Sequence, residues 1–338
     1  MSRTHVAILP IEPDPERYAA QWFDWWRDGL VKAGWETARV CGDLSRSYER
    51  KRGEWLDPIQ TWQWKGEQIA TLAEKWDKLP TDCVVLALDG WGPAAEAFGY
   101  MRAVTGRIDL RLVLYMHAGT YDHADYLFRI GMEDWAQHSE RGWMECADML
   151  LVGSAFHRDL LYDSRDIDKA KVQVVGCPVT IPDETIEVPW QSRNGLIFPH
   201  RIAPEKRPDI WKRITQLQIP SVRCETTRVL QSDGTYAPRS KDDYYRALAS
   251  ARVVFSAAEQ ETFGIAMQEG MLAGCYPVAP RRVSYPELIP DEWLYETEQE
   301  AAELVEKALA MDEPYSGGAS SLCTDCISLA GAAMRTMP

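Results

Sequence analysis

The stretch from Ala251 to Pro290 constrains the fold more than any other part of the sequence. A short apolar run at Val253–Phe255 predicts a buried strand, and a small polar loop, 256–262, follows it. An amphipathic segment over about 263–272, ended by a glycine, predicts a helix, and the apolar run 275–279 predicts a second strand. Strand, helix and strand in this order form a βαβ unit, whose two strands run parallel.

Two carboxylates frame the start of this helix, with Glu261 just before it and Glu269 on its second turn. Between them, Gly264 removes a side chain where a ligand could approach the backbone. The N–H groups at a helix N-terminus favour a phosphate, and a carboxylate can accept hydrogen bonds from vicinal sugar hydroxyls. The residues therefore suggest a sugar-nucleotide site. The spacing alone fits ordinary helix-capping or solvated glutamates equally well.

The spacing Glu261-x7-Glu269, with Phe263-Gly264 inside it, resembles the E-x7-E signature of retaining glycosyltransferases of the family 4 type, which have the GT-B fold. The longer text GCYPVAPRRVSYPELIP at 274–290 resembles the branch of tRNA-queuosine mannosyltransferases and related phage DNA glycosyltransferases. The resemblance extends from about Leu112 to Pro290. It implies an α/β protein with two Rossmann-like, doubly wound parallel-sheet domains that face each other across a cleft.

Composition agrees with a soluble protein of two domains. The 338 residues suffice for two cores, and 46% apolar with 26% charged residues is ordinary for a globular chain. No run of 18 apolar residues predicts a membrane span, and the N-terminus does not read as a secretory signal. The spacing Cys323-x2-Cys326 lacks a second pair, so we expect no metal there, and the eight cysteines favour free thiols in a reducing cytoplasm.

We expect an acceptor-side domain over 1–183, a nucleotide-sugar domain over 184–312, and a tail, 313–338, that could cross back to the first domain. Ser154 should cap a helix, and Thr297 with Glu300 should form a capping box. The predicted strands are 5–9, 37–41, 83–88, 110–116, 148–153, 172–175, 195–198, one within 221–230, and one near Trp293; the predicted helices outside the central unit are about 16–33, 59–78, 133–147, one after Ser154, 241–251 and 297–311.

The resemblance assigns roles on the donor side. Arg201 and Lys206 match the paired cations that bind the donor diphosphate, whose charge grows as the glycosidic bond breaks. The N–H groups near Gly264 and Ile265 would assist them. Glu269 would bind the ribose, and Glu261 would contact hydroxyls of the transferred sugar. The alternative for the two cations is a solvated helix start.

From the first domain, His117 follows a predicted strand and resembles the histidine that contacts the transferred sugar in the family. A histidine satisfied by a backbone carbonyl is the structural alternative. By position alone, Glu12, Arg17 and Tyr18 are further candidates, because the chain has PIEPDPERY where many members carry a glycine pair. Residues 121–123 would line the acceptor side.

The resemblance implies a UDP- or GDP-sugar as co-substrate, no other cofactor, no metal, and front-face attack in which the leaving phosphate helps to remove the acceptor proton. The transferred group would be a hexose or a pentose. We read Asp166 and Asp168 as a solvated turn.

The acceptor is open to several interpretations. The queuosine-type resemblance suggests a hydroxyl on a modified nucleobase, in tRNA or in phage DNA with hydroxymethylpyrimidine. The basic loop 45–53, followed by Trp55, Trp62 and Trp64, could grip a phosphate backbone and stack a base; a solvated loop before core tryptophans is the alternative. The net charge of −14 fits a small-molecule or lipid-head acceptor better. A non-catalytic sugar-nucleotide-binding module is the third possibility.

Overall fold

The computed structural model describes residues 3–12, 18–43, 58–185, 187–217, 222–230 and 236–337. The chain divides into two compact units, residues 1–178 with 325–338 and residues 179–324. The tail predicted over 313–338 is thus shared between the units, and its last helix belongs to the first. Among the described residues, no helix is both long enough and apolar enough to cross a membrane.

The described part of the first unit contains a parallel sheet with the order β2-β1-β3-β4-β5-β6. All its pairings are parallel, for example Val6 with Val84 and Leu114 with Leu150. Strands that are buried on both faces read as continuous apolar runs, and β3, β4 and β5 do so. The predicted strands are confirmed to within two residues: β1 (His5–Leu9), β2 (Glu36–Arg39), β3 (Val84–Ala87), β4 (Arg111–Tyr115), β5 (Met149–Val152) and β6 (Val172–Val174).

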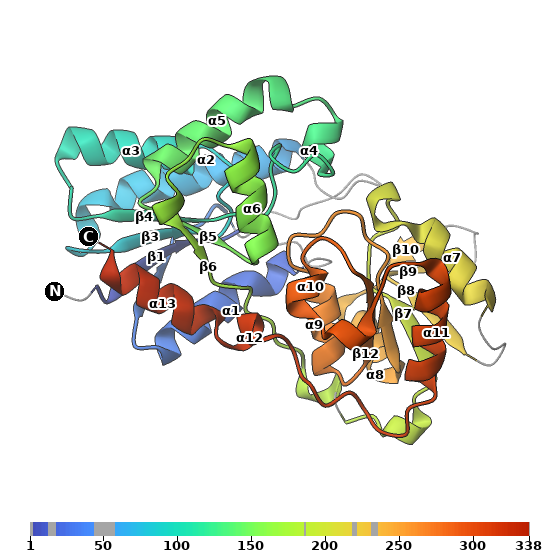
Figure 1. The fold of residues 1–338 in the computed structure, drawn as a ribbon. Coiled ribbons are helices and arrows are strands. Elements are labelled where there is room, and N and C mark those ends of the chain that lie inside the picture. Colours follow the sequence, from blue (N-terminus) through green and yellow to red (C-terminus); the bar gives the residue numbers. More distant parts are fainter. Residues whose placement is uncertain are drawn as a thin grey trace. The chain divides into compact units, whose positions relative to one another are not determined.

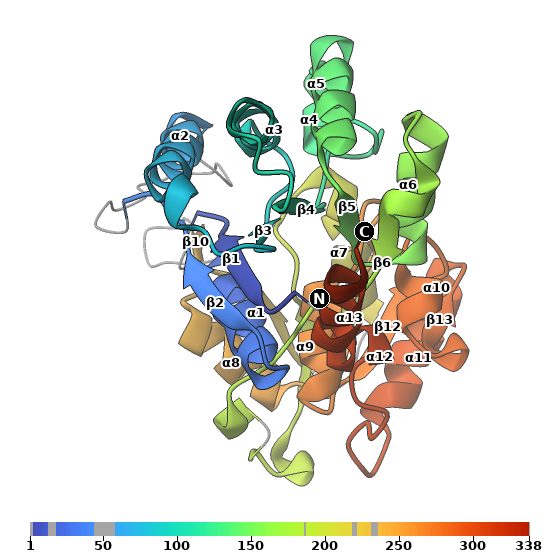
Figure 2. The same ribbon diagram turned by 90° about the vertical axis from the view of Figure 1, so that its left-hand side faces the viewer.

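Helices cover both faces of this sheet (Figures 1 and 2). Helices α2, α3 and α5 lie together on one face, and α1 and α13 lie on the other. Ser154 caps α6 by accepting a hydrogen bond from the His157 N–H, as predicted. The bounds are α1 (Ala19–Lys32), α2 (Pro58–Lys75), α3 (Ala94–Thr105), α4 (Tyr126–Arg129), α5 (Glu133–Cys146), α6 (Ala155–Ser164) and α13 (Cys326–Thr336).

The C-terminal helix α13 packs directly against α1. A Cβ placed on Gly29 would lie 2.6 Å from the Ile327 side chain, so only glycine permits this approach. Arg335 donates to the Ala33 carbonyl at 2.6 Å, and Arg3 donates to the Met337 carbonyl at 2.7 Å. The C-terminal helix is therefore part of the first unit, and its end is hydrogen-bonded to the N-terminal segment at Arg3.

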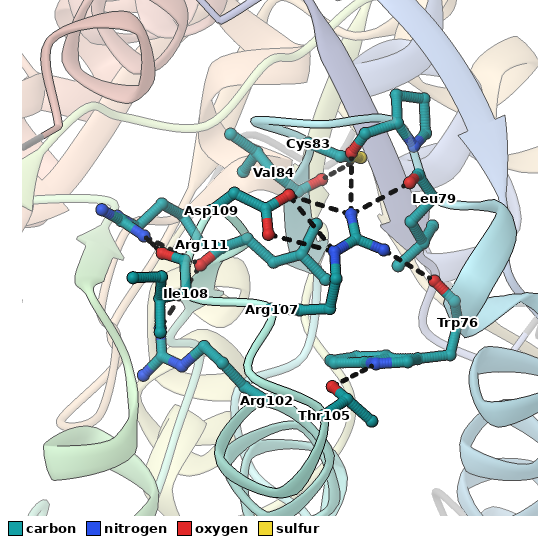
Figure 3. A network of polar contacts seen from close by, with 12 residues as sticks. Trp76, Leu79, Cys83, Val84, Arg102, Thr105, Arg107, Ile108, Asp109 and Arg111 are labelled. Atoms are coloured by element: carbon teal, nitrogen blue, oxygen red, sulfur yellow. Dashed lines mark hydrogen bonds and ion pairs between the residues drawn. The ribbon is translucent and has the colours of Figure 1, made fainter.

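The amino-terminal edge of the first sheet is fixed by Arg107 (Figure 3). Its guanidinium pairs with Asp109 at 2.9 Å and donates to the carbonyls of Trp76 and Leu79, at 3.2 and 3.0 Å. Five donors in a planar fork suit such a junction. The network joins the chain after α2 to the turn before β4, at the edge opposite the loops that carry His117, so its role is structural.

At the carboxyl edge, a buried carboxylate ties two loops together. Glu140 of α5 is fully buried and pairs with Arg165 at 2.7 Å. It also accepts from the Thr120 N–H at 2.7 Å and from the Trp91 indole N–H at 2.9 Å. Because Thr120 follows β4 and Trp91 follows β3, one side chain sets the positions of both loops.

The described part of the second unit contains a smaller parallel sheet with the order β13-β12-β11-β7-β8, and a separate antiparallel pair of β9 and β10. The single strand expected within 221–230 is thus two, β8 and β9. The strands are β7 (Gly195–Phe198), β8 (Arg223–Thr226), β9 (Arg228–Leu230), β10 (Tyr236–Pro238), β11 (Val253–Phe255), β12 (Tyr276–Pro280) and β13 (Leu294–Tyr295).

Helices α7 and α11 lie on one face of this sheet, and α8 and α9 lie on the other (Figure 1). The predicted capping box of Thr297 and Glu300 is confirmed at the start of α11. Helix α9 starts two residues later than predicted because Gly264 has a left-handed backbone, with φ 85°. The helices are α7 (Pro208–Leu217), α8 (Lys241–Ser250), α9 (Ile265–Leu272), α10 (Tyr285–Leu288), α11 (Glu298–Leu309) and α12 (Ser321–Thr324).

Replacement of Glu140 by alanine should destabilise the protein strongly, because Arg165 would remain buried without its partner. We expect a loss of about 3–5 kcal/mol, the usual cost of breaking a buried ion pair from one side. Glu145→Ala is the matched control on the same helix. Its partner Arg141 is half exposed, so the loss should stay below about 1 kcal/mol. Urea unfolding followed by tryptophan fluorescence measures both, and equal midpoints for the two variants would contradict this account.

Candidate functional site

The candidate donor site lies where two neighbouring strands of the second sheet end. Strand β7 pairs in parallel with β11, so the chain leaves both strands at the same edge. From β7 the chain connects outward to β8, whereas β11 lies on the other side of β7. Ligands of doubly wound sheets bind at such a switch point, outside the carboxyl ends of the strands.

Lys206 and Glu261 meet at this edge. The Lys206 ammonium lies 3.2 Å from Oε2 of Glu261 and also donates to the Gln260 carbonyl. Both side chains are largely buried, with 9% and 19% of their surfaces exposed, so the interpretation of Lys206 as a solvated surface cation is wrong. Burial alone would raise the pKa of Glu261, but the charge of Lys206 and its hydrogen bond hold that pKa below its ordinary value. Glu261 is therefore a carboxylate, which can only accept hydrogen bonds.

Arg201 lies on the same loop as Lys206 and pairs with Glu205, which accepts from its Nε at 2.9 Å. The Glu205 carboxylate is buried, whereas 38% of the Arg201 side chain is exposed. Arg201 and Lys206 both act electrostatically on His200, so the two predicted cations belong to one cluster.

His200 is a central residue of this cluster that the sequence analysis did not single out. Its Nε2 lies 2.8 Å from the Ser256 hydroxyl, which lies 2.7 Å from the Tyr285 hydroxyl. Burial, reinforced by Lys206, lowers the pKa of His200 to about 3, so the imidazole is neutral at physiological pH. A histidine two residues after a predicted strand, in the text FPHR, was the available signal.

Gly264 and Ile265 form the N-terminus of α9. Gly264 needs its left-handed conformation, and a Cβ there would lie 3.0 Å from the Tyr285 ring. The first N–H groups of a helix have no partner within the helix and carry its positive dipole end. Arg282 steadies the loop before this helix by donating to the carbonyls of Ala257 and Ala258, at 2.8 and 3.0 Å. The helix terminus is thus held beside Glu261.

Glu269 lies on the same helix and is almost completely buried. Its two carboxylate oxygens accept from two tyrosines of α8, Oε2 from Tyr244 at 2.8 Å and Oε1 from Tyr245 at 3.0 Å. Lys241 lies 3.8 Å from Oε1. The sequence alternative of a solvated glutamate is therefore wrong for Glu269, because its carboxylate is oriented by three side chains.

His117 belongs to the first unit, not to the unit that holds the other six predicted site residues. Its Nε2 lies 2.8 Å from the Leu88 carbonyl and its Nδ1 lies 3.3 Å from the Tyr18 hydroxyl. A carbonyl only accepts, so Nε2 carries a proton. The carbonyl contact of the structural alternative is thus present, and the Tyr18 hydroxyl is the partner of Nδ1.

Other predicted residues lie outside this cluster. Arg17 and the basic loop 45–53 lie outside the described residues. Among the described residues, no group of three or more His, Cys, Asp or Glu side chains could hold a metal ion. Cys323 contacts the buried Gln268 side chain at 3.6 Å.

The buried histidines should make stability fall as the pH is lowered. The folded pKa values of His200 and His157 are about 3, below the unfolded value of about 6.5, so the unfolded chain binds more protons between these limits. Each histidine then contributes a slope of up to about 1.4 kcal/mol per pH unit, with full stability above pH 6.5. Between pH 7 and 5, His200→Gln should reduce the fall in melting temperature. The same change at the exposed His138 should not, and an unchanged slope in His200→Gln would refute the assignment.

No family model matches the sequence. A curated relative, the tRNA-queuosine alpha-mannosyltransferase of Drosophila melanogaster, is 27% identical over 196 residues. The alignment covers 45% of this chain and 52% of that enzyme, so it spans about half the length of the relative.

Solved structures resemble nearly the whole chain. Sucrose-phosphate synthase from Thermosynechococcus elongatus gives a TM-score of 0.65 at 13% identity, covering 99% of this chain and 95% of that one. HepE of Anabaena, solved with UDP and glucose, gives a TM-score of 0.58 at 12% identity, covering 99% of this chain and 95% of that one. The lipopolysaccharide outer core galactosyltransferase WaaB gives a TM-score of 0.56 at 12% identity, covering 91% of this chain and 90% of that one. At such identities the likeness shows the fold alone: two parallel-sheet α/β domains of the GT-B type, as predicted.

Proposed function

We propose that this protein is a retaining glycosyltransferase of the family 4 type, which moves a sugar from a UDP- or GDP-sugar to a hydroxyl of a modified nucleobase. The observation that carries the proposal is the convergence of Lys206, Glu261 and the N-terminus of α9 at the switch point of the second sheet. Cation, carboxylate and helix terminus are the groups that a phosphate with an attached sugar requires.

The diphosphate of the donor binds to Lys206, Arg201 and the N–H groups of Gly264 and Ile265. In the largely buried setting of Lys206 the interaction of charges is stronger than in water, so the cation stabilises the charge that develops on the leaving diphosphate. Glu269 accepts hydrogen bonds from the ribose hydroxyls, with Tyr244 and Tyr245 holding its orientation.

The transferred sugar contacts Glu261, whose lowered pKa keeps it an acceptor for hydroxyl protons. The resemblance assigns a further contact with the transferred sugar to His117 of the first unit. The acceptor oxygen forms a bond to the anomeric carbon on the face from which the diphosphate departs. The bond between the anomeric carbon and the phosphate oxygen breaks, and the acceptor proton passes to that departing oxygen. This scheme needs no protein nucleophile and no metal.

The nucleobase acceptor is supported by one relative, whose name states that it modifies tRNA-queuosine. The basic sequence Arg50-Lys51-Arg52 would hold the phosphate backbone. The net charge of −14 keeps a small-molecule or lipid-head acceptor as the second candidate, and a sugar-nucleotide-binding module without transfer as the third.

Lys206→Met should weaken the binding of UDP or GDP about 10–100-fold, since a hydrogen bond to a charged group contributes about 1.5–3 kcal/mol. Lys212→Met is the matched control, because Lys212 is exposed on α7, the helix that follows this loop. Isothermal titration with each nucleotide measures both variants. Equal affinities for the two variants would remove Lys206 from the donor site.

Mass spectrometry of tRNA and of DNA with hydroxymethylated pyrimidines, incubated with the protein and a panel of UDP- and GDP-sugars, tests the function itself. We expect a hexose or pentose on the base. Neutralising Arg50, Lys51 and Arg52 together should lower this transfer and flatten its dependence on salt, because fewer counterions are released on binding.

The alternatives give different results. Label in a small product, with no effect of the triple change, would favour a metabolite acceptor. Tight binding of donor without transfer or hydrolysis, across broad acceptor pools, would favour the binding module.

A further inference from the structure

Three hydrogen-bonded side chains of the second unit determine which ring nitrogen of His200 carries a proton. Nε2 of His200 lies 2.8 Å from the Ser256 hydroxyl, which lies 2.7 Å from the Tyr285 hydroxyl. Ser256 and Tyr285 are completely buried, and 5% of His200 is exposed. Because these side chains are almost closed to water, each hydroxyl proton needs an acceptor inside the protein.

The Ser256 hydroxyl has a fixed capacity, because it can donate one hydrogen bond and accept two. The Ala258 N–H donates to it at 3.2 Å and takes one acceptor position. Of its two other neighbours, His200 and Tyr285, one must therefore donate to Ser256 and the other must accept from it. Burial lowers the pKa of His200 to about 3, so the imidazole carries only one proton at neutral pH. Two arrangements of the protons are thus possible.

The two arrangements differ in what happens to the Tyr285 proton. If His200 donates to Ser256, then Ser256 donates to Tyr285, and the tyrosine proton has no acceptor among the described residues. A buried donor without a partner costs the full desolvation of that group. If Tyr285 donates to Ser256, then Ser256 donates to Nε2 of His200, and both hydroxyl protons have an acceptor. The second arrangement is therefore favoured, and it places the imidazole proton on Nδ1.

Nδ1 of His200 lies at the surface of the donor cluster. It has no hydrogen-bonding partner within the described part of the chain, and it is not one of the enclosed polar atoms there that lack a partner. Phe198 meets the imidazole ring edge-on at a centroid distance of 5.0 Å, and the Thr227 hydroxyl donates to the His200 carbonyl at 2.7 Å. Ring and backbone are thus both held, so the Nδ1–H group has a fixed direction.

The surroundings of this N–H group favour an anionic ligand. The group can only donate, so its ligand must offer an oxygen that accepts. Arg201 follows His200 directly, and Arg201 and Lys206 both act on the imidazole through their positive charges. The Glu261 carboxylate acts on it as well, but it is paired with Lys206. A neutral donor beside two cations adds a hydrogen bond without repelling them, and a phosphate oxygen can accept from all three.

We propose that His200 is a further residue of the donor site, whose Nδ1–H donates to a phosphate oxygen of the nucleoside diphosphate. Ser256 is a positioning residue, because its hydroxyl donates to Nε2 and so holds the proton on Nδ1. Tyr285 fills the second acceptor position of Ser256. This inference rests on the proposed function and adds an uncharged contact to the cations and the helix terminus named there.

The position of the proton is measurable in the protein without ligand. Long-range proton–nitrogen NMR spectra of ¹⁵N-labelled histidine distinguish protonated from unprotonated ring nitrogens, and His200→Gln identifies the His200 signals by their absence. We expect the proton on Nδ1. Ser256→Ala should shift part of the population to Nε2, since nothing then donates to that nitrogen. Ser284→Ala is the matched control, because Ser284 is equally buried and its hydroxyl has no partner among the described residues. It should leave the proton on Nδ1.

Two substitutions of His200 separate a ligand contact from a structural role. Asparagine carries its amide at the place of Nδ1, whereas glutamine carries its amide at the place of Nε2, where it can accept from Ser256. Isothermal titration with UDP, GDP and inorganic pyrophosphate measures both variants. His200→Gln should bind the diphosphates about tenfold more weakly than the wild type, and His200→Asn should keep most of the affinity. A purely structural role predicts the reverse order, because only glutamine keeps the Ser256 contact.

A proton on Nε2 in the wild type would overturn the inference, and so would equal binding by the wild type and His200→Gln. In both cases the proposed function stands if Lys206→Met still weakens nucleotide binding. An unchanged proton position in Ser256→Ala would overturn the role of Ser256. If the wild type binds neither UDP, GDP nor pyrophosphate, the inference falls together with the proposed donor.

Discussion

The candidate site depends on one constraint in the sheet. The first strand of each unit pairs with the next strand of the chain on one side and, in parallel, with a later strand on the other side. In the second unit the pairing of Leu196 with Val253 and of Ile197 with Val254 brings the ends of β7 and β11 together, although 54 residues separate Lys206 from Gln260 along the chain. Parallel strands end at one edge, so the two loops must share that edge. The first unit repeats the arrangement with β1 and β3.

The carboxyl edges of both sheets contain buried charged groups. At the second sheet, Lys206 is buried with Glu261, and burial of a charge is tolerated only with a partner. The neutral His200 binds the Ser256 hydroxyl beside this pair and adds no fixed charge. At the first sheet, Glu140 and Arg165 hold the loops, and Lys65 with Asp89 occupies the switch point. At both edges the buried charged groups are therefore paired with a partner inside the protein.

Short-range chemistry made much of the fold predictable from the sequence. Apolar runs such as CVVLAL predict buried strands because parallel sheets are covered on both faces, and Ser154 and the Thr297–Glu300 box act within one helical turn. The sequence analysis did not predict helices α3 and α7. Gly99 interrupts the pattern of α3, and the packing of α3 on α5 outweighs that weak local preference.

The sequence by itself determined most of the strands, the helix caps at Ser154 and Thr297, and the residue types of the candidate donor site, because each depends on neighbours within a few positions. Only the tertiary structure decided that Lys206 bonds to Glu261, that Tyr244 and Tyr245 orient Glu269, that His200 is a neutral member of the cluster, and that Glu140 fixes Trp91. These contacts join residues 24 to 56 positions apart. No local pattern encodes such distances, and the pairing of strands sets them.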